Sequence, residues 1–270
     1  MLPPLNLWLL NREPCLFRIY EEPEKEKIEA LRDTAQSVGL NLVKGQVLKT
    51  KHLNQLLRQA EKQNEAELLS MSILRAMTQA YYSRENFGHF GLALRAYAHF
   101  TSPIRRYADL VVHRALIRAH KWEERGLTQE EEATLEKISD QISISERRSM
   151  AAERDTLDRY LAIYLSKKIG NEFSGRISGV VKFGVFIRLD ESGAEGLVPI
   201  RSLGREYFTL DKKFNRLAGA KSGFKLSLGQ NVTVRLAEAT SENGGIIFEL
   251  LTVEGSTVPS RFAGKSRLKK

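Results

Sequence analysis

Residues 175–189 read GRISGVVKFGVFIRL, and they carry the pattern that decides the fold of this chain. Short runs of alternating apolar and polar residues, punctuated by glycine, are typical of β-strands joined by tight turns. The same texture predicts strands at 173–180, 181–189, 195–200, 231–239 and 245–251. Five short strands within roughly eighty residues predict a small closed β-barrel over residues 170–253.

Two phenylalanines, Phe183 and Phe186, stand three residues apart in the second predicted strand. Residues at this spacing face opposite sides of a regular strand, so a bend is expected nearby, and Gly184 permits one. An exposed aromatic ring on a barrel stacks against a nucleic-acid base, worth about 1–3 kcal/mol per base. Arg188 and Arg235 lie where they can reach phosphates. The alternative is that the two phenylalanines belong to the core.

The barrel residues resemble a known domain. Residues 175–189, EGLVPI at 195–200 and GQNVTV at 229–234 are similar to an S1 domain. That resemblance implies a five-stranded OB-fold that binds single-stranded RNA. Pro199 stands where S1 sequences usually have histidine, so one polar contact to a base or phosphate is expected to be missing.

Upstream of the barrel the pattern is mainly helical. A short strand is predicted at 15–20, and a helix from Pro23 that Gly39 ends. A helical stretch follows over 52–81, with polar residues at 61–67 that can break it. A capping box of Thr128 with Glu131 predicts a last helix, which continues towards Gly170. The predicted fold class is α+β: a mainly helical part (1–169), the barrel (170–253) and a basic disordered tail (254–270).

Residues 97–107, YAHFTSPIRRY, predict another helix start, with Ser102 as the cap and Pro103 at the first helical position. Arg105 and Arg106 would then lie in the first turn, where the helix dipole disfavours cations but a bound phosphate would suit them. His99, Thr101 and Ser102 add donors just upstream. The alternative is a capped helix with two solvated arginines.

The same stretch resembles a family signature. Residues 99–107, HFTSPIRRY, followed by Asp109 and HR at 113–114, are similar to the signature of the RNB family of exoribonucleases, and NFGHFGL at 86–92 resembles its ribonuclease R branch. The resemblance implies 3′-to-5′ hydrolysis of single-stranded RNA to nucleoside monophosphates with the help of Mg²⁺. It implies that Arg105 is catalytic, at the scissile phosphate.

The resemblance also implies further site residues. Glu153, in AERD at 152–155, matches a functional glutamate of some family members, although a solvated helix residue is an equal alternative. The expected RNA-binding residues are His99, Thr101, Ser102, Arg106, Tyr107, Phe183, Phe186, Arg188 and Arg235.

The family carries its metal-binding aspartates as a tight cluster before the arginine signature. Here no two of the seven aspartates are adjacent and none precedes Asp33. We therefore expect only the C-terminal part of an RNB catalytic domain, in a chain that starts inside a longer gene or after a disrupted reading frame. Mg²⁺ is expected for the complete enzyme, its ligands are absent from this chain, and the chain alone is predicted to bind RNA without cleaving it. The alternative is a stand-alone, catalytically inactive RNA-binding protein.

Charge and composition agree with a polyanion as partner. The chain has 42 lysines and arginines against 33 acidic residues, a net charge of +9. Such an excess attracts nucleic acid or an acidic membrane face. A basic membrane-surface or structural protein is therefore a third functional hypothesis, beside the exoribonuclease part and the stand-alone RNA-binding protein. The single cysteine, Cys15, excludes an internal disulfide and agrees with the cytoplasm. No apolar run approaches the length of a membrane span, so no membrane partner is expected.

Overall fold

The computed structural model describes residues 14–43, 48–63, 66–122, 125–204, 206–211 and 216–258. The chain divides into two compact units. The first comprises Met1–Ile28, Leu42–Leu56 and Arg75–Met150, and the second Glu29–Asn41, Leu57–Leu74 and Ala151–Lys270. This division rests on spatial contacts and does not test the predicted boundaries at residues 170 and 254, which stay a prediction. Most of the predicted tail, residues 259–270, lies outside the described residues.

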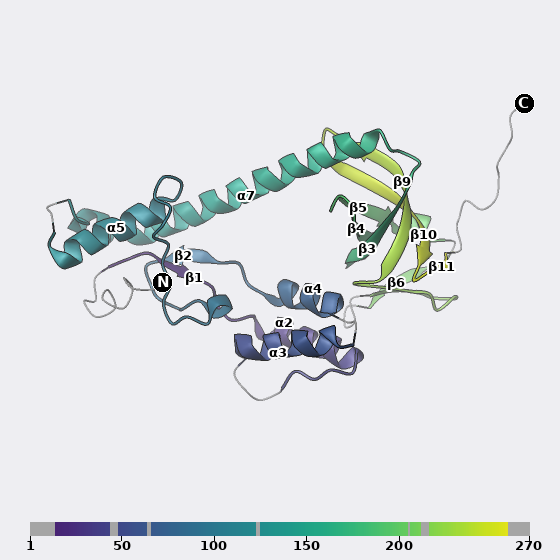
Figure 1. The fold of residues 1–270 in the computed structure, drawn as a ribbon, viewed down its shortest axis with the longest axis horizontal. Coiled ribbons are helices and arrows are strands. Elements are labelled where there is room, and N and C mark those ends of the chain that lie inside the picture. The colour runs from purple at the N-terminus through teal and green to yellow at the C-terminus, as the bar shows by residue number, and fades with distance from the viewer. Residues whose placement is uncertain are drawn as a thin grey trace, which may run out of the picture. The chain divides into compact units, whose positions relative to one another are not determined.

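The elements follow one another along the chain as a helical part and then a strand-rich part (Figure 1). The helices are α2 (Lys25–Ser37), α3 (Thr50–Glu61), α4 (Ala66–Ala76), α5 (Tyr107–His120), α6 (Gln129–Ala133) and α7 (Leu135–Ser166), with short 3₁₀ helices η1 (Phe90–Leu92) and η2 (Ile200–Ser202). The strands are β1 (Phe17–Ile19), β2 (Tyr81–Ser83), β3 (Glu172–Val181), β4 (Gly184–Leu189), β5 (Glu195–Pro199), β6 (Phe208–Asp211), β7 (Arg216–Gly219), β8 (Lys225–Ser227), β9 (Asn231–Thr240), β10 (Gly245–Val253) and β11 (Ser256–Thr257).

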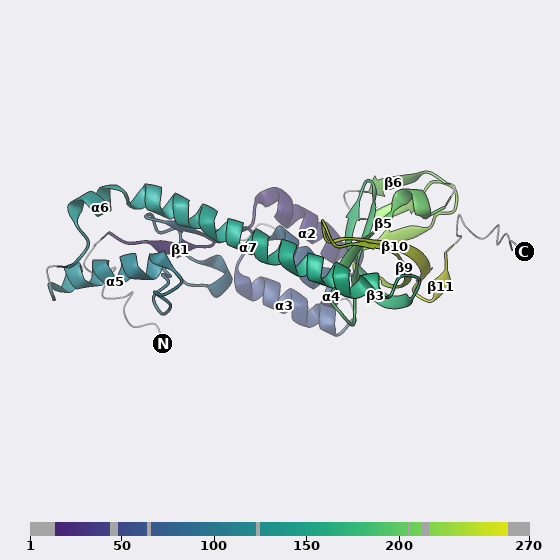
Figure 2. The same cartoon turned by 90° about the horizontal axis from the view of Figure 1, so that it is seen from above.

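The first unit is built around the strand β1, which pairs antiparallel with β2. Figure 2 shows β1 between α5 and the first half of α7. The buried core of this unit joins Ile19 of β1, Val112 of α5 and Leu135 of α7. Burial of these apolar side chains is the main force that holds the two helices against the strand.

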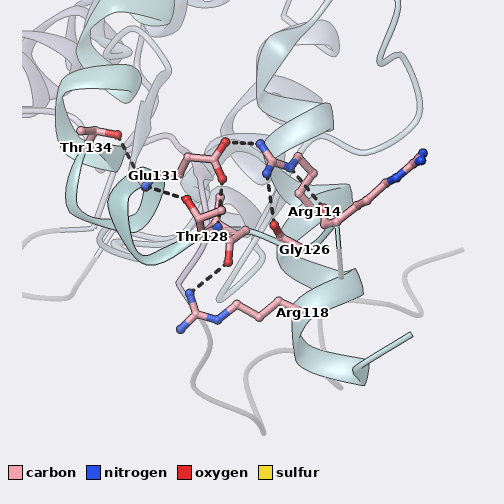
Figure 3. Close-up of polar contacts among 8 residues, drawn as sticks. Arg114, Arg118, Gly126, Thr128, Glu131 and Thr134 are labelled. Carbon is pink, nitrogen blue, oxygen red and sulfur yellow. Dashed lines mark hydrogen bonds and ion pairs between the residues drawn. The ribbon is translucent and has the colours of Figure 1, made fainter. Parts of the chain in front are cut away.

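The corner between α5 and α6 confirms the predicted capping box. The Thr128 hydroxyl accepts a hydrogen bond from the backbone N–H of Glu131 (3.2 Å), and the Glu131 carboxylate accepts one from the Thr128 N–H (2.9 Å). Figure 3 shows the Arg114 guanidinium between the Glu131 carboxylate and the carbonyl oxygen of Gly126. A Cβ on Gly126 would lie 2.9 Å from the backbone nitrogen of Arg118, so only glycine fits this close approach.

Two predicted helix bounds are wrong. The stretch predicted over 52–81 forms α3 and α4 with a break at the polar residues, as expected, but Tyr81 belongs to the strand β2. The helix predicted from Pro103 begins only at Tyr107, with Arg106 in extended conformation (φ −127°, ψ 112°) as its N-cap residue. Local propensity favoured the earlier start, and the hydrogen bond from the Ser102 N–H to the Asp109 carboxylate overrides it.

The five predicted barrel strands are confirmed, and they close into an OB-like barrel. β3 pairs antiparallel with β4 and β9, β4 with β5, and β9 with β10. A parallel pairing of Ile247 with Leu197, between β10 and β5, completes the ring. The barrel interior is apolar, and Phe248 is its largest fully buried side chain. Closure removes the open sheet edges that would otherwise expose unpaired backbone groups.

One part of the second unit was missed. The strands β6, β7 and β8 form a separate three-stranded antiparallel sheet, for which no strands were predicted. Its Phe208, Leu217 and Leu226 are buried in the barrel core. These strands are only three or four residues long, so they offer too few alternating positions for a sequence pattern to register.

No helix within the described ranges combines the length and the apolar character that a membrane span needs.

Candidate nucleic-acid interface

The arginine-containing segment 99–106 forms a turn, not the first turn of a helix. The Ser102 carbonyl oxygen accepts hydrogen bonds from the backbone N–H groups of Arg105 (3.3 Å) and Arg106 (3.1 Å). Because α5 begins at Tyr107, both arginines precede the helix. The prediction that they share its first turn is therefore wrong. The acidic residue in that turn is Asp109, which suits the positive end of the helix dipole.

The two neighbouring arginines have different surroundings. The Arg106 side chain is only 19% exposed and donates from Nη2 to Asp109 Oδ2 (3.0 Å). Arg105 is exposed, and its guanidinium makes no hydrogen bond or ion pair with the residues that the structure describes. An anion can therefore approach Arg105 without first displacing an internal partner.

His99, the first residue of this segment, is half-buried. Its Nδ1 lies 2.8 Å from the Tyr82 hydroxyl, and its ring meets the Tyr97 ring edge-on. Burial, together with the nearby Arg106 and Arg18 cations, lowers the pKa of His99 to about 4. Burial also raises the pKa of Tyr82, so the pair is an uncharged phenol and an uncharged imidazole near neutral pH. His99 can offer an N–H donor there, but no positive charge.

The buried state of His99 predicts a pH-dependent stability. Unfolding returns the ring to its ordinary pKa of 6.5, so the unfolded chain binds a proton first as the pH falls. The contribution of the neutral ring is complete above about pH 6.5 and is lost as the pH falls towards about 4. We expect the His99 ring signal in a proton NMR titration to stay in its neutral position at pH 5.5. A midpoint near 6.5 would contradict the expected burial. The His99→Gln variant should lose this part of the pH dependence of unfolding.

The other residues predicted for the site differ in their exposure to solvent. Thr101 is exposed, and Tyr107 is 51% exposed at the start of α5. Ser102 is half-buried, and its backbone N–H donates to Asp109 Oδ2 (2.6 Å). Glu153 lies on α7 within the second compact unit, where it is exposed.

An aromatic ring on the barrel, that of Phe183, is exposed to solvent. Phe183 lies in the turn before β4 and is 56% exposed, while Phe186 inside β4 is half-buried. The two rings meet edge-to-face with their centroids 6.2 Å apart. The predicted bend is the turn at residues 182–183, directly before Gly184. A Cβ on Gly184 would lie 2.2 Å from the Val198 carbonyl oxygen, so a side chain does not fit there. Phe183 is therefore not a core residue and offers a stacking surface.

The two predicted barrel arginines also differ. Arg188 is exposed on β4, opposite Glu195 of β5. Arg235 on β9 already donates to Glu172 (2.9 Å) and to Glu249 (3.2 Å). A phosphate at Arg235 would have to compete with both carboxylates, so Arg188 is the more available cation.

The described residues do not fit a Mg²⁺ site. Within the described ranges, no three His, Cys, Asp or Glu side chains are grouped as metal ligands would be. Asp109, the buried acid of the signature, already accepts from Ser102 and Arg106 at Oδ2. A neighbouring guanidinium repels a divalent cation, so this carboxylate does not serve as its ligand.

Several residues of this site were not identified from the sequence. Arg18 of β1 pairs with Glu146 of α7 (2.6 Å), and its guanidinium lies over the Tyr82 ring, 4.7 Å from the centroid. Ser143, one turn from Glu146, accepts a hydrogen bond from the Tyr82 N–H (2.9 Å). These contacts join residues more than sixty positions apart, and no local spacing predicts them.

The fold and site define a class: an RNB-type helical segment that carries an arginine signature, followed by an S1 barrel. The RNB domain profile matches residues 7–121, and the S1 RNA binding domain profile matches residues 166–251. The chain therefore carries RNB and S1 domain sequences, and the relatives that it resembles are ribonuclease R proteins.

The relatives are considerably longer than this chain. Ribonuclease R of Aquifex aeolicus is 40% identical over 88% of this chain and 34% of that protein, and the Escherichia coli protein is 39% identical over 90% and 31%. The apo form of Mycoplasma genitalium RNase R matches with a TM-score of 0.81 at 29% identity, covering 90% of this chain and 39% of that one. The same protein, with the same score and coverage, has been solved with ribose methylated single-stranded RNA. The chain thus spans about a third of the length of the curated relatives it matches.

Proposed function

We propose that this chain is the C-terminal part of a 3′-to-5′ exoribonuclease that hydrolyses single-stranded RNA, and that by itself it binds RNA without cleaving it. The observation that carries the proposal is the S1 barrel with the exposed Phe183, in the same chain as the signature turn with the exposed Arg105. A relative of similar fold, solved with single-stranded RNA, supports the choice of ligand.

In the proposed enzyme, Arg105 stabilises the negative charge that develops on the scissile phosphate during attack by water. An exposed guanidinium that has no side-chain partner among the described residues suits that role. Phe183 stacks on a base while Arg188 contacts the backbone. Around the turn, His99, Thr101, Ser102, Arg106 and Tyr107 are further RNA-binding residues. On the barrel, Phe186 and Arg235 are further RNA-binding residues, and Glu153 is a further candidate catalytic residue on α7.

We further propose that the complete enzyme uses Mg²⁺, which activates water and neutralises phosphate charge, held by residues other than those described here. A cytoplasmic location is proposed from the single cysteine, which is buried and reduced.

The stacking role of Phe183 predicts a loss of RNA affinity on truncation. In Phe183→Ala the dissociation constant for a labelled single-stranded 12-mer should rise about 5- to 150-fold, since one stacked base is worth about 1–3 kcal/mol. Tyr207→Ala is the matched control, because Tyr207 is an exposed aromatic of the same unit (76% exposed) with no assigned role. Fluorescence anisotropy at two salt concentrations measures both. Equal losses in the two variants would refute a specific stacking site.

The second part of the proposal needs a cleavage assay. Incubating the purified chain with uniformly labelled single-stranded RNA and Mg²⁺ should give binding but no release of nucleoside monophosphates. Continuous release of nucleoside monophosphates that is absent in Arg105→Ala would show that the chain is active by itself. It would contradict the proposal that the chain alone does not cleave RNA. If the chain neither binds nor cleaves, the RNA-binding proposal fails as well.

A further inference from the structure

Asp109 is a fully buried carboxylate, which is unusual because burying a charged group is costly. Its side chain is 0% exposed, yet it lies on the first turn of α5 beside the proposed phosphate-binding turn. Removing a carboxylate from water costs several kcal/mol unless it is paired. Asp109 meets part of this cost through Oδ2, which accepts from the Ser102 N–H (2.6 Å) and from Arg106 Nη2 (3.0 Å), while its buried Oδ1 has no hydrogen-bond partner among the described residues. Both partners belong to the turn that carries Arg105.

A second residue of α5 contacts the same segment. His113 follows Asp109 by four positions, so both side chains project from the same helix face. Its Nε2 lies 2.8 Å from the Phe100 carbonyl oxygen, to which the ring N–H donates, and its ring lies against the Phe100 ring with centroids 4.4 Å apart. Asp109 and His113 therefore hold the backbone of the segment at Ser102 and at Phe100.

The backbone bonds of the turn transmit this constraint to Arg105. Ser102 donates to Asp109 and accepts from the N–H groups of Arg105 and Arg106, so its peptide is fixed on both sides. Arg106 is drawn inward by its pair with Asp109. Arg105 is then left on the outside, exposed and without a side-chain partner among the described residues.

We propose that Asp109 and His113 are positioning residues, which clamp the segment 100–106 so that Arg105 is presented to an RNA phosphate. Neither of them touches the RNA. The inference rests on the proposed function, since it assigns phosphate contact to Arg105. A purely structural role predicts something different, because the two residues would then stabilise α5 without regard to Arg105.

A double-mutant cycle in the 270-residue chain separates these two roles. The proteins are the wild type, Asp109→Asn, Arg105→Ala and the double variant, with His113→Ala treated in the same way. Asparagine keeps the shape of the side chain and one acceptor oxygen for the Ser102 N–H. We expect Arg105→Ala to weaken binding of a single-stranded 12-mer about tenfold. Asp109→Asn should weaken it severalfold when Arg105 is present, and less than about twofold when it is absent.

Losses that simply add would overturn the proposal, because residues that act through Arg105 cannot lower affinity after it is removed. Thermal unfolding of each variant shows whether the fold is retained. If Asp109→Asn does not fold, the His113→Ala cycle decides, since that variant removes the half-buried side chain and leaves the buried ion pair intact.

A local readout distinguishes failure of this inference from failure of the proposed function. In the wild type, inorganic phosphate should shift the Nε–Hε NMR signal of Arg105, and the shift should shrink severalfold in Asp109→Asn and in His113→Ala. If the Arg105 signal behaves in this way while the chain does not bind RNA, the positioning role of Asp109 and His113 is supported and the proposed RNA-binding function is refuted. If the Arg105 signal does not respond in the wild type, or responds equally in all three proteins, the clamp is refuted.

Discussion

Arg105→Ala is expected to lower the turnover of a complete enzyme about 10²- to 10³-fold, while RNA affinity falls by no more than about tenfold. The complete enzyme is made by joining this chain to the upstream part of a ribonuclease R relative. Removing one preorganised donor to a developing anion typically costs this much turnover, because the interaction strengthens in the transition state. Affinity is spared because it is spread over the S1 barrel and other contacts.

Single-turnover kinetics and equilibrium binding on the same labelled RNA measure the two effects separately. Arg95→Ala is the matched control, since Arg95 is an exposed arginine of the same compact unit. Turnover of that variant should stay within about twofold of the parent. Equal losses of turnover and affinity in Arg105→Ala would reduce Arg105 to a binding residue.

The second large effect concerns the barrel. Gly184→Ala should lower the free energy of unfolding of the second unit by about 3 kcal/mol, because overpacking against backbone cannot be relieved by a rotamer change. A Cβ at this position would lie 2.2 Å from the Val198 carbonyl oxygen, between two paired strands. The same distortion moves Phe183, so RNA affinity should fall as well.

Gly193→Ala is the control for this experiment. Gly193 has a positive φ of 68°, but an added Cβ would meet nothing within 4 Å, so the cost should be about 1 kcal/mol. Urea unfolding followed through the amide NMR signals of β4 and β5 reports on the barrel alone. If both variants lose the same stability, the contact with Val198 is not what excludes a side chain at residue 184.

The turn before Gly184 shows what the local sequence pattern can predict. The spacing of Phe183 and Phe186 predicted a bend, and the structure confirms it with Phe183 exposed. The spacing could not say which ring faces solvent. That depends on the Val198 carbonyl oxygen, which fills the space next to Gly184 and belongs to a different strand.

The start of α5 shows where local pattern fails. Ser102 and Pro103 carry the signals of a helix start, yet the helix begins at Tyr107. The Ser102 N–H donates a hydrogen bond to the carboxylate of Asp109, seven residues later. Arg106, between them, has an extended backbone conformation, so no helix can run from Ser102 to Asp109. Capping preferences are worth about 1 kcal/mol, which is less than the cost of leaving a buried carboxylate unpaired.

By itself the sequence determined the α+β class, the five barrel strands, the capping box at Thr128 and the signature that contains Arg105, because each depends on residues close together in the chain. The tertiary structure alone decided that Arg105 has no side-chain partner among the described residues while Arg106 pairs with the buried Asp109, that His99 is neutral, and that Arg235 is held between two carboxylates. These properties depend on burial and, for His99 and Arg235, on partners from other elements. The physical reason is that charge and hydrogen bonding act through space, whereas strand and helix periodicity act along the chain.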